Sequence, residues 1–232
     1  MIKKYLSNVS SLYKGTTKIA SAYKGDQLVY SSGLPSEYQE VEWIKNDTKG
    51  AYFDTQLSVA NATRIQANAK FEWVEVGGSE SCFLGCRTNS DRCMIFNMYP
   101  SLTWEIGYTS NYTSGSKFTL NTLYEVSADL QNGSQTVVAN GNTVVSATKS
   151  GTITQTNTLW ILANNYSQST NKYNCRAKIY SMDISIDGVK ERDFVPCYRK
   201  ADNVIGLYDL VYGTFYTNQG SGTFTKGNDV WH

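Results

Sequence analysis

Residues 180–195, YSMDISIDGVKERDFV, decide the fold class of this chain. Apolar side chains occupy every second position of the first half, at Tyr180, Met182, Ile184 and Ile186. This alternation is typical of a β-strand with one buried face. The Asp-Gly pair at 187–188 suits a two-residue hairpin turn, and residues 189–195 should return as a second strand. We expect that strand to stop at Pro196, which cannot donate a backbone hydrogen bond.

The same alternation recurs through most of the chain and predicts an all-β protein. It is longest from Arg64 to Val74, where a polar residue separates each apolar one, so one face of an antiparallel sheet should be wet. Hairpin turns are expected at 132–133 and 140–141, both Asn-Gly, and residues 111–117 are expected to be a polar loop. No window of about a dozen residues repeats apolar positions at helical spacing, so almost no helix is expected. Further strands are expected at 82–87, 94–99, 103–108, 124–130 and 159–163. Many short strands joined by turns predict a two-sheet antiparallel sandwich.

Length and charge narrow the function classes. The chain has 232 residues, which is enough for one sizeable core. Its formal net charge of +1 gives no global field that would attract nucleic acid or an anionic membrane. No apolar run is long enough to span a membrane, and the first residues lack the apolar core of a secretion signal. We therefore expect no nucleic-acid partner, no membrane insertion and a chain that stays in the cell where it is made.

The first thirty residues contain a short repeat, Tyr-Lys-Gly at 13–15 and again at 23–25. We predict a three-stranded β-meander over residues 1–30, a linker over 31–36 and one sandwich domain over 37–232. A meander this small needs a partner surface, so it is expected to dock onto other proteins. An extra sheet folded onto its own sandwich is the alternative. The candidate docking residues are Tyr13, Lys14, Lys18, Tyr23 and Lys24.

Three segments resemble the concanavalin-A-like (laminin-G-like) jelly-roll domains that recur in bacteriophage virion proteins and gut-bacterial surface proteins. They are residues 38–59, YQEVEWIKNDTKGAYFDTQLSV, residues 179–200, IYSMDISIDGVKERDFVPCYRK, and residues 204–224, VIGLYDLVYGTFYTNQGSGTF. The resemblance covers about residues 38–227 and implies a jelly roll. The N-terminal repeat is similar to small modules of phage structural proteins.

Together these resemblances imply a non-enzymatic virion structural protein, such as a tail-fibre or capsid-decorating component. It would display a lectin-like jelly roll for attachment to host-surface glycans, or for decoration of the particle, and would bind other virion proteins through residues 1–30. Such a protein is assembled in the host cytoplasm and released by lysis, and we expect a homotrimer. The alternatives are a carbohydrate-binding module of a gut-bacterial protein and, behind it, a glycoside hydrolase.

Two loops have the composition of a sugar site, with aromatic rings to stack on pyranose faces and amides to bind hydroxyl groups. They span residues 108–112 and 164–173. Trp104 and Ile106 share a strand face with Tyr108, so Trp104 is expected in the core. The candidate glycan-binding residues are Tyr108, Tyr112, Asn164, Asn165, Tyr166 and Tyr173.

Catalytic patterns are weak. The single histidine is the C-terminal residue, His232. Glu40 and Glu42 have the alternate spacing of glucanase carboxylates but lack the aspartate between them and a third acidic residue. We therefore expect a solvated strand face and no enzyme.

Metal and redox patterns are equally weak. The five cysteines lack metal-site spacing and are expected to be reduced, buried thiols. No cofactor is expected; a calcium ion at a rim remains an alternative, with Asp54, Asp91 and Asp202 as turn aspartates but no local run of ligands. Asp209 with Arg192 or Arg199 is expected to form a buried pair.

Overall fold

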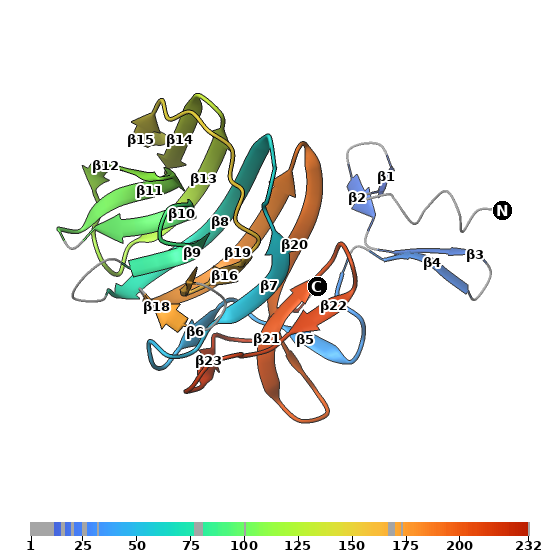
Figure 1. Ribbon diagram of the computed structural model, residues 1–232. Helices are drawn as coiled ribbons and strands as arrows, with labels where there is room; N and C mark the ends of the chain where they lie inside the picture. The colour runs from blue at the N-terminus through green and yellow to red at the C-terminus, as the bar shows by residue number, and fades with distance from the viewer. Residues whose placement is uncertain are drawn as a thin grey trace.

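A computed structural model describes the backbone of residues 12–14, 17–19, 21–24, 27–31, 33–76, 81–99, 101–166, 170–172 and 174–231. Side chains are described from residue 33 onward, except in residues 97–99 and 170–172. Two large sheets lie face to face as a jelly-roll sandwich (Figure 1), and the described residues contain no helix. The expected all-β sandwich is thus confirmed. Among those residues no helix could cross a membrane.

One layer of the sandwich is an eight-stranded sheet. Its main path runs through β12 (Asn111–Lys117), β11 (Thr103–Thr109), β10 (Arg92–Tyr99), β9 (Ser81–Arg87), β16 (Thr158–Ile161) and β7 (Phe53–Ser58). The short strand β17 (Asn164–Tyr166) pairs parallel with β9 and antiparallel with β18 (Thr170–Lys172). This branch brings residues 164–166 beside the end of β9.

The other layer is an eleven-stranded sheet. Its path runs through β15 (Asn142–Ala147), β14 (Ser134–Ala139), β13 (Leu123–Gln131), β8 (Arg64–Glu75), β19 (Arg176–Ile186), β20 (Val189–Arg199), β21 (Val204–Asp209) and β22 (Thr214–Tyr216). Three short strands extend it: β5 (Tyr38–Glu40), β6 (Ile44–Asn46) and β23 (Phe224–Lys226).

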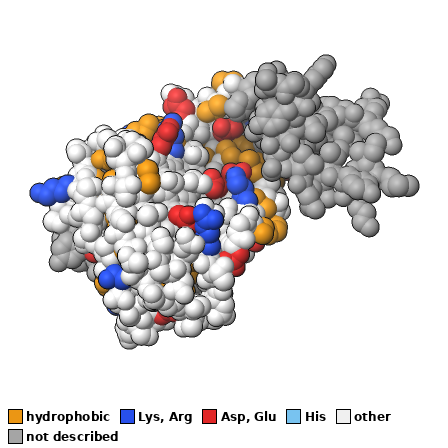
Figure 2. Space-filling view, turned by 90° about the horizontal axis from the view of Figure 1, so that it is seen from above, with side chains coloured by type: hydrophobic (Ala, Val, Ile, Leu, Met, Phe, Trp, Pro, Cys, Tyr) orange, Lys and Arg blue, Asp and Glu red, His pale blue; other side chains and the backbone are white. Residues whose placement is uncertain are grey.

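On the surface seen in Figure 2, positive and negative side chains are interspersed, so the face shown there carries no large field of one sign.

Aromatic side chains fill the space between the layers. Phe71 of β8 stacks on Phe83 of β9 with ring centroids 4.0 Å apart, and Trp73 and Trp104 pack edge-on around them. Trp104 is 1% exposed and lies in the core, as predicted from the strand face that it shares with Ile106 and Tyr108. Along β8 the side chains of the apolar face are buried, Arg64 and Asn68 point to solvent, and Glu72 is the buried exception on the polar face.

The hairpin of β19 and β20 has the predicted turn: Asp187 and Gly188 both have positive φ, at 52° and 84°. The Asp187 carboxylate also accepts hydrogen bonds from the backbone N–H of Thr63 and Arg64, both 2.8 Å, which ties the turn to the start of β8. The turn residues therefore hold two neighbouring strands in register.

The expected stop at Pro196 is wrong, because β20 continues through it to Arg199. Along one edge, β20 pairs with β19 up to Phe194 and with β5 from Cys197 onward. Pro196 lies where the partner changes, and its carbonyl accepts from Val41 N at 3.0 Å. In an antiparallel ladder the N–H and C=O of a residue face the same side, so the missing donor of Pro196 faces this gap.

Residues 111–117 form strand β12 and not the polar loop predicted for them. The strand lies at the edge of its sheet and pairs with β11 through backbone hydrogen bonds, with its side chains mostly exposed. Edge pairing needs no apolar alternation, which is why the composition misled the prediction.

The five cysteines are buried and unbridged, in agreement with their expected state.

Near the N-terminus the described backbone forms two separate two-stranded hairpins, where a three-stranded meander was predicted. They are β1 (Leu12–Lys14) with β2 (Thr17–Ile19), and β3 (Ser21–Lys24) with β4 (Gln27–Ser31). Each hairpin reverses next to a Lys-Gly pair, at the positions the repeat indicates. The proposed docking residues Tyr13, Lys14, Lys18, Tyr23 and Lys24 lie in these strands, but their side chains are outside the described part.

Candidate functional site

Two arginines and two tyrosines gather at one end of the eight-stranded sheet, and we call them the Arg–Tyr cluster: Arg87, Arg92, Tyr112 and Tyr166. Arg87 ends β9, Arg92 begins β10, Tyr112 lies in β12 and Tyr166 ends β17. In register, Arg87 is the partner of Arg92 on one side and of Tyr166 on the other. Their neighbours Cys86 and Cys93 point into the core, so the arginines point out of the sandwich.

The tyrosine rings hold the guanidinium groups by hydrogen bonding and by cation–π contact. Arg87 Nη1 donates to Tyr112 Oη at 2.6 Å. The guanidinium carbon of Arg87 lies 5.2 Å from the Tyr166 ring centroid, and that of Arg92 lies 4.4 Å from the Tyr112 ring centroid. Both distances are within the range of cation–π attraction. Arg87 is 8% exposed, whereas Arg92 and both tyrosines are partly exposed.

The turn between β9 and β10 supports the cluster from below. Arg92 donates from Nη1 to Ser110 O at 2.7 Å and from Nη2 to Asn89 O at 3.3 Å, and Tyr166 Oη donates to Asn89 Oδ1. The Nε of Arg92 is buried and has no hydrogen-bond acceptor. A short turn therefore fixes the arginine while leaving it with unused donor capacity.

Asp91, in the same turn, uses its carboxylate in another direction. Its Oδ2 accepts hydrogen bonds from the backbone N–H groups of Thr154 and Gln155. These bonds tie the turn to the segment that precedes β16. Asp91 therefore ties the turn that carries the cluster to that segment.

The structure separates the six predicted glycan-binding residues. Tyr112 and Tyr166 come together in the Arg–Tyr cluster. Tyr108 is 3% exposed and belongs to the core, because it shares a strand face with Trp104 and Ile106. Its hydroxyl donates to Gly151 O at 3.1 Å, and burial raises its pKa.

The two asparagines are also buried, at 0% and 1% exposure for Asn164 and Asn165, instead of lying in an open loop. Asn165 Nδ2 donates to Thr158 O at 2.9 Å, which secures β17 to β16. They are buried because β17 is inserted beside β9 as a strand. Tyr173 lies outside the described residues.

Sequence reasoning missed Arg87 and Arg92. They flank a four-residue turn, residues 88–91, and so become direct cross-strand partners. Predicting the register of the two strands across this turn would have shown that the two arginines lie opposite one another.

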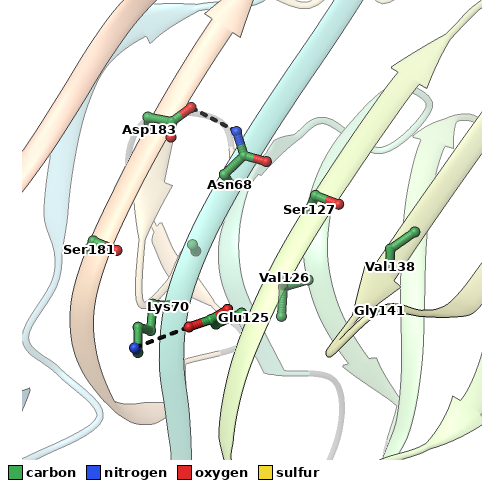
Figure 3. A pocket seen from close by; sticks show the side chains of 10 residues that line it. Asn68, Lys70, Glu125, Val126, Ser127, Val138, Gly141, Ser181 and Asp183 are labelled. Carbon is green, nitrogen blue, oxygen red and sulfur yellow. Dashed lines mark hydrogen bonds and ion pairs between the residues drawn. The ribbon is translucent and has the colours of Figure 1, made fainter. Parts of the chain in front are cut away.

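A shallow hollow of about 450 Å³ lies on the outer face of β13, β8 and β19 (Figure 3). Four of its polar side chains pair with one another: Lys70 pairs with Glu125 at 3.1 Å, and Asn68 Nδ2 donates to Asp183 at 2.9 Å. No aromatic side chain lines it. The hollow therefore has the character of a solvated sheet face. The lining residues are Asn68, Ala69, Lys70, Glu125, Val126, Ser127, Val138, Gly141, Ser181 and Asp183.

The acidic residues singled out in the sequence do not converge. Glu42 is exposed and accepts from Asn228 N and Nδ2, at 3.3 and 3.1 Å. Asp54 accepts from Gln56 N at 2.8 Å, and Asp202 pairs with Arg199 at 2.6 Å. Within the described ranges, no three His, Cys, Asp or Glu side chains are placed to hold a metal ion together.

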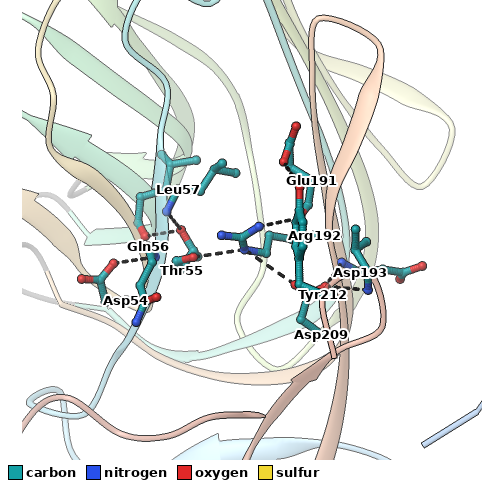
Figure 4. Close-up of polar contacts among 11 residues, drawn as sticks. Asp54, Thr55, Gln56, Leu57, Glu191, Arg192, Asp193, Asp209 and Tyr212 are labelled. Carbon is teal, nitrogen blue, oxygen red and sulfur yellow. Dashed lines mark hydrogen bonds and ion pairs between the residues drawn. The ribbon is translucent and has the colours of Figure 1, made fainter. Parts of the chain in front are cut away.

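Arg192 and Asp209 form the buried ion pair that was expected between the final hairpin and the sandwich (Figure 4). Their nearest atoms are 3.8 Å apart, and the side chains are 9% and 0% exposed. Arg192 Nε also donates to Thr55 O in β7 at 3.1 Å, so the pair links the two sheets. Burial raises the pKa of Asp209, against the lowering effects of its hydrogen bonds and of Arg192. The pair is a structural tie.

No protein-family model and no curated protein matches this chain. Similar solved structures include a Trypanosoma rangeli sialidase in complex with sialic acid, with 12% identity, a TM-score of 0.46 and coverage of 82% of this chain but 35% of the sialidase. A Caenorhabditis elegans galectin has 12% identity and a TM-score of 0.40 over 66% of this chain and 99% of its own. A family 7 alginate lyase has 14% identity and a TM-score of 0.38, over 58% and 67%. The chain spans about a third of the sialidase's length, and similarities this weak carry no argument about ligand or activity.

Proposed function

We propose that this chain is a non-enzymatic glycan-binding jelly roll and that the Arg–Tyr cluster is its binding site. The observation that supports this most directly is the convergence of Tyr112 and Tyr166, from separate strands, on the guanidinium of Arg87. Aromatic ring edges offer contact area to the CH groups of a sugar, and fixed guanidinium and amide groups bind its hydroxyl groups. The cluster offers both on a partly exposed face.

The finer proposal is that the chain is a virion component of a bacteriophage, displaying the jelly roll for host attachment or particle decoration. The resemblance of residues 38–59, 179–200 and 204–224 to virion jelly rolls supports it. The N-terminal hairpins, which form sheets of their own, support a separate docking role for residues 1–30. In this proposal the chain docks onto other virion proteins, assembles as a homotrimer in the host cytoplasm and leaves by lysis. A carbohydrate-binding module of a gut bacterium is the alternative.

Binding of the full chain to an array of glycans tests the proposal. We expect binding to a restricted set of glycans and its loss when Tyr112→Ala and Tyr166→Ala are combined. Tyr212→Ala is the matched control, because Tyr212 is 59% exposed on the turn between β21 and β22. Absence of any glycan binding, or equal loss in the control, would contradict the proposal.

The enzymatic alternative has its own measurement. Glycans that bind are incubated with the protein and analysed by mass spectrometry for shortened products. We expect none. Hydrolysis that disappears in Glu42→Gln would instead support a glycoside hydrolase.

A further inference from the structure

The Arg–Tyr cluster places two positive charges side by side. Arg87 and Arg92 are direct cross-strand partners at the start of the β9–β10 hairpin. Like charges directly opposite one another destabilise a sheet. A fold that makes two arginines direct cross-strand partners departs from this rule, and functional sites are where proteins do so.

Arg92 is the arginine with capacity for a ligand. Its two hydrogen bonds inside the protein go to neutral backbone carbonyls, of Ser110 and Asn89, and its buried Nε has no acceptor. Among the described side chains, no carboxylate forms an ion pair with it. A guanidinium carries five N–H donors, so Nη1 and Nη2 each keep one further N–H for a ligand, while the buried Nε is not open to one.

The tyrosines orient the guanidinium groups. Arg92 lies over the Tyr112 ring and Arg87 over the Tyr166 ring, so the ring face under each guanidinium is not free to stack on a sugar. A ring contact fixes the plane of the guanidinium, and the remaining Nη N–H groups are donors that a carboxylate or a sulfate accepts from.

We propose that the ligand is an acidic glycan whose carboxylate or sulfate group is bound by Arg92, with Arg87 adding to the positive field. This inference rests on the proposed function, that the cluster binds a glycan. The anionic group balances the charge of Arg92. The uncharged part of the sugar lies against the exposed edges of Tyr112 and Tyr166.

The experiment compares three sets of glycans on the full-length protein, with the same neutral core: unmodified, carboxylated and sulfated. We expect an acidic set to bind at least about tenfold more tightly than the neutral set, and binding to weaken as salt is added. The stronger of the two acidic sets identifies the anionic group.

Variants of Arg92 assign the effect to one side chain. Arg92→Gln should lower affinity for the acidic glycan by about 10- to 100-fold, the usual effect of losing a charge-assisted hydrogen bond. Arg92→Lys should recover part of the loss, since it keeps the charge without the fork. Arg199→Gln, on the eleven-stranded sheet, is the control and should bind normally.

The outcomes separate this inference from the proposal beneath it. Equal binding of neutral and acidic glycans, with no effect of Arg92→Gln, would overturn the inference and leave glycan binding in place. If no glycan binds but inorganic sulfate raises the unfolding temperature of the wild type and not of Arg92→Gln, anion recognition by Arg92 is supported and glycan binding is overturned. If neither glycan nor sulfate acts, both fail.

Discussion

Replacing Arg192 by methionine should be among the most damaging single changes on the polar side chains of this protein. The substitution keeps most of the side-chain volume but leaves the Asp209 carboxylate, 0% exposed, without its counter-ion. Its Oδ2 has no hydrogen bond, and Thr55 O loses its donor at the same time. Breaking a buried pair in this way costs about 3–5 kcal/mol. For a domain of this size that corresponds to a fall in unfolding temperature of roughly 6–20 °C.

Arg199→Met is the matched control, and it separates burial from distance. Arg199 lies only 2.6 Å from Asp202, closer than the 3.8 Å of the buried pair, but those two side chains are 40% and 43% exposed. Exposed pairs contribute little, so this variant should unfold at nearly the wild-type urea concentration. Urea unfolding of both variants and the wild type, followed by tryptophan fluorescence, measures the difference.

The pH dependence of Arg192→Met gives a second check. Burial raises the pKa of Asp209 above its unfolded value of about 3.9. A group with a raised folded pKa contributes stability below the unfolded pKa and loses that contribution as the pH rises through the folded pKa. Arg192 lowers the pKa of Asp209, so its removal raises that pKa further, and the buried carboxyl is protonated and uncharged at low pH. The loss of unfolding free energy in Arg192→Met should therefore be smaller at pH 4 than at pH 7. An equal deficit at both pH values, or a control variant that is equally unstable, would refute this account.

Two further predictions concern the frame of the sandwich. The pKa of Asp187 is lowered, first because its carboxylate accepts a hydrogen bond from the Thr63 hydroxyl. Its stabilising effect is therefore present above about pH 4 and is lost as the pH falls. Asp187→Asn should be less stable than the wild type at pH 7, and the urea unfolding curves of the two proteins should converge in acid. Gly115→Ala should destabilise the sheet edge and speed amide exchange in β12, because its Cβ would lie 1.8 Å from Val144 O, whereas Gly33→Ala, with open space around it, should change neither stability nor exchange.

The sequence predicted the parts of this fold in which side-chain chemistry decides structure. Alternation in β8 and β19 follows from burying one sheet face, and the Asp187-Gly188 turn follows from the need for positive φ. It failed where backbone pairing decides. β12 is a strand because an edge offers free partners, and β20 passes Pro196 because its neighbouring strand changes there.

The candidate site divides in the same way. Composition singled out Tyr112 and Tyr166, which the structure brings together in the Arg–Tyr cluster, since aromatic residues in polar surroundings are visible in a sequence. Arg87 and Arg92 were missed because their proximity depends on the register of one turn. Asn164 and Asn165 were misjudged because β17 is buried beside β9, a parallel pairing that local sequence does not encode.

The parallel pairing of β17 with β9 also bears on how the protein folds. The hydrogen bond between Tyr166 and Asn89 joins residues 77 positions apart, and the chain between them forms strands β10 to β16. Contacts of such long sequence separation form slowly, because the entropy of closing the intervening loop comes first. During refolding, ligand-binding competence should thus recover later than the local hairpins, which makes the cluster an internal reporter of completed assembly of the eight-stranded layer.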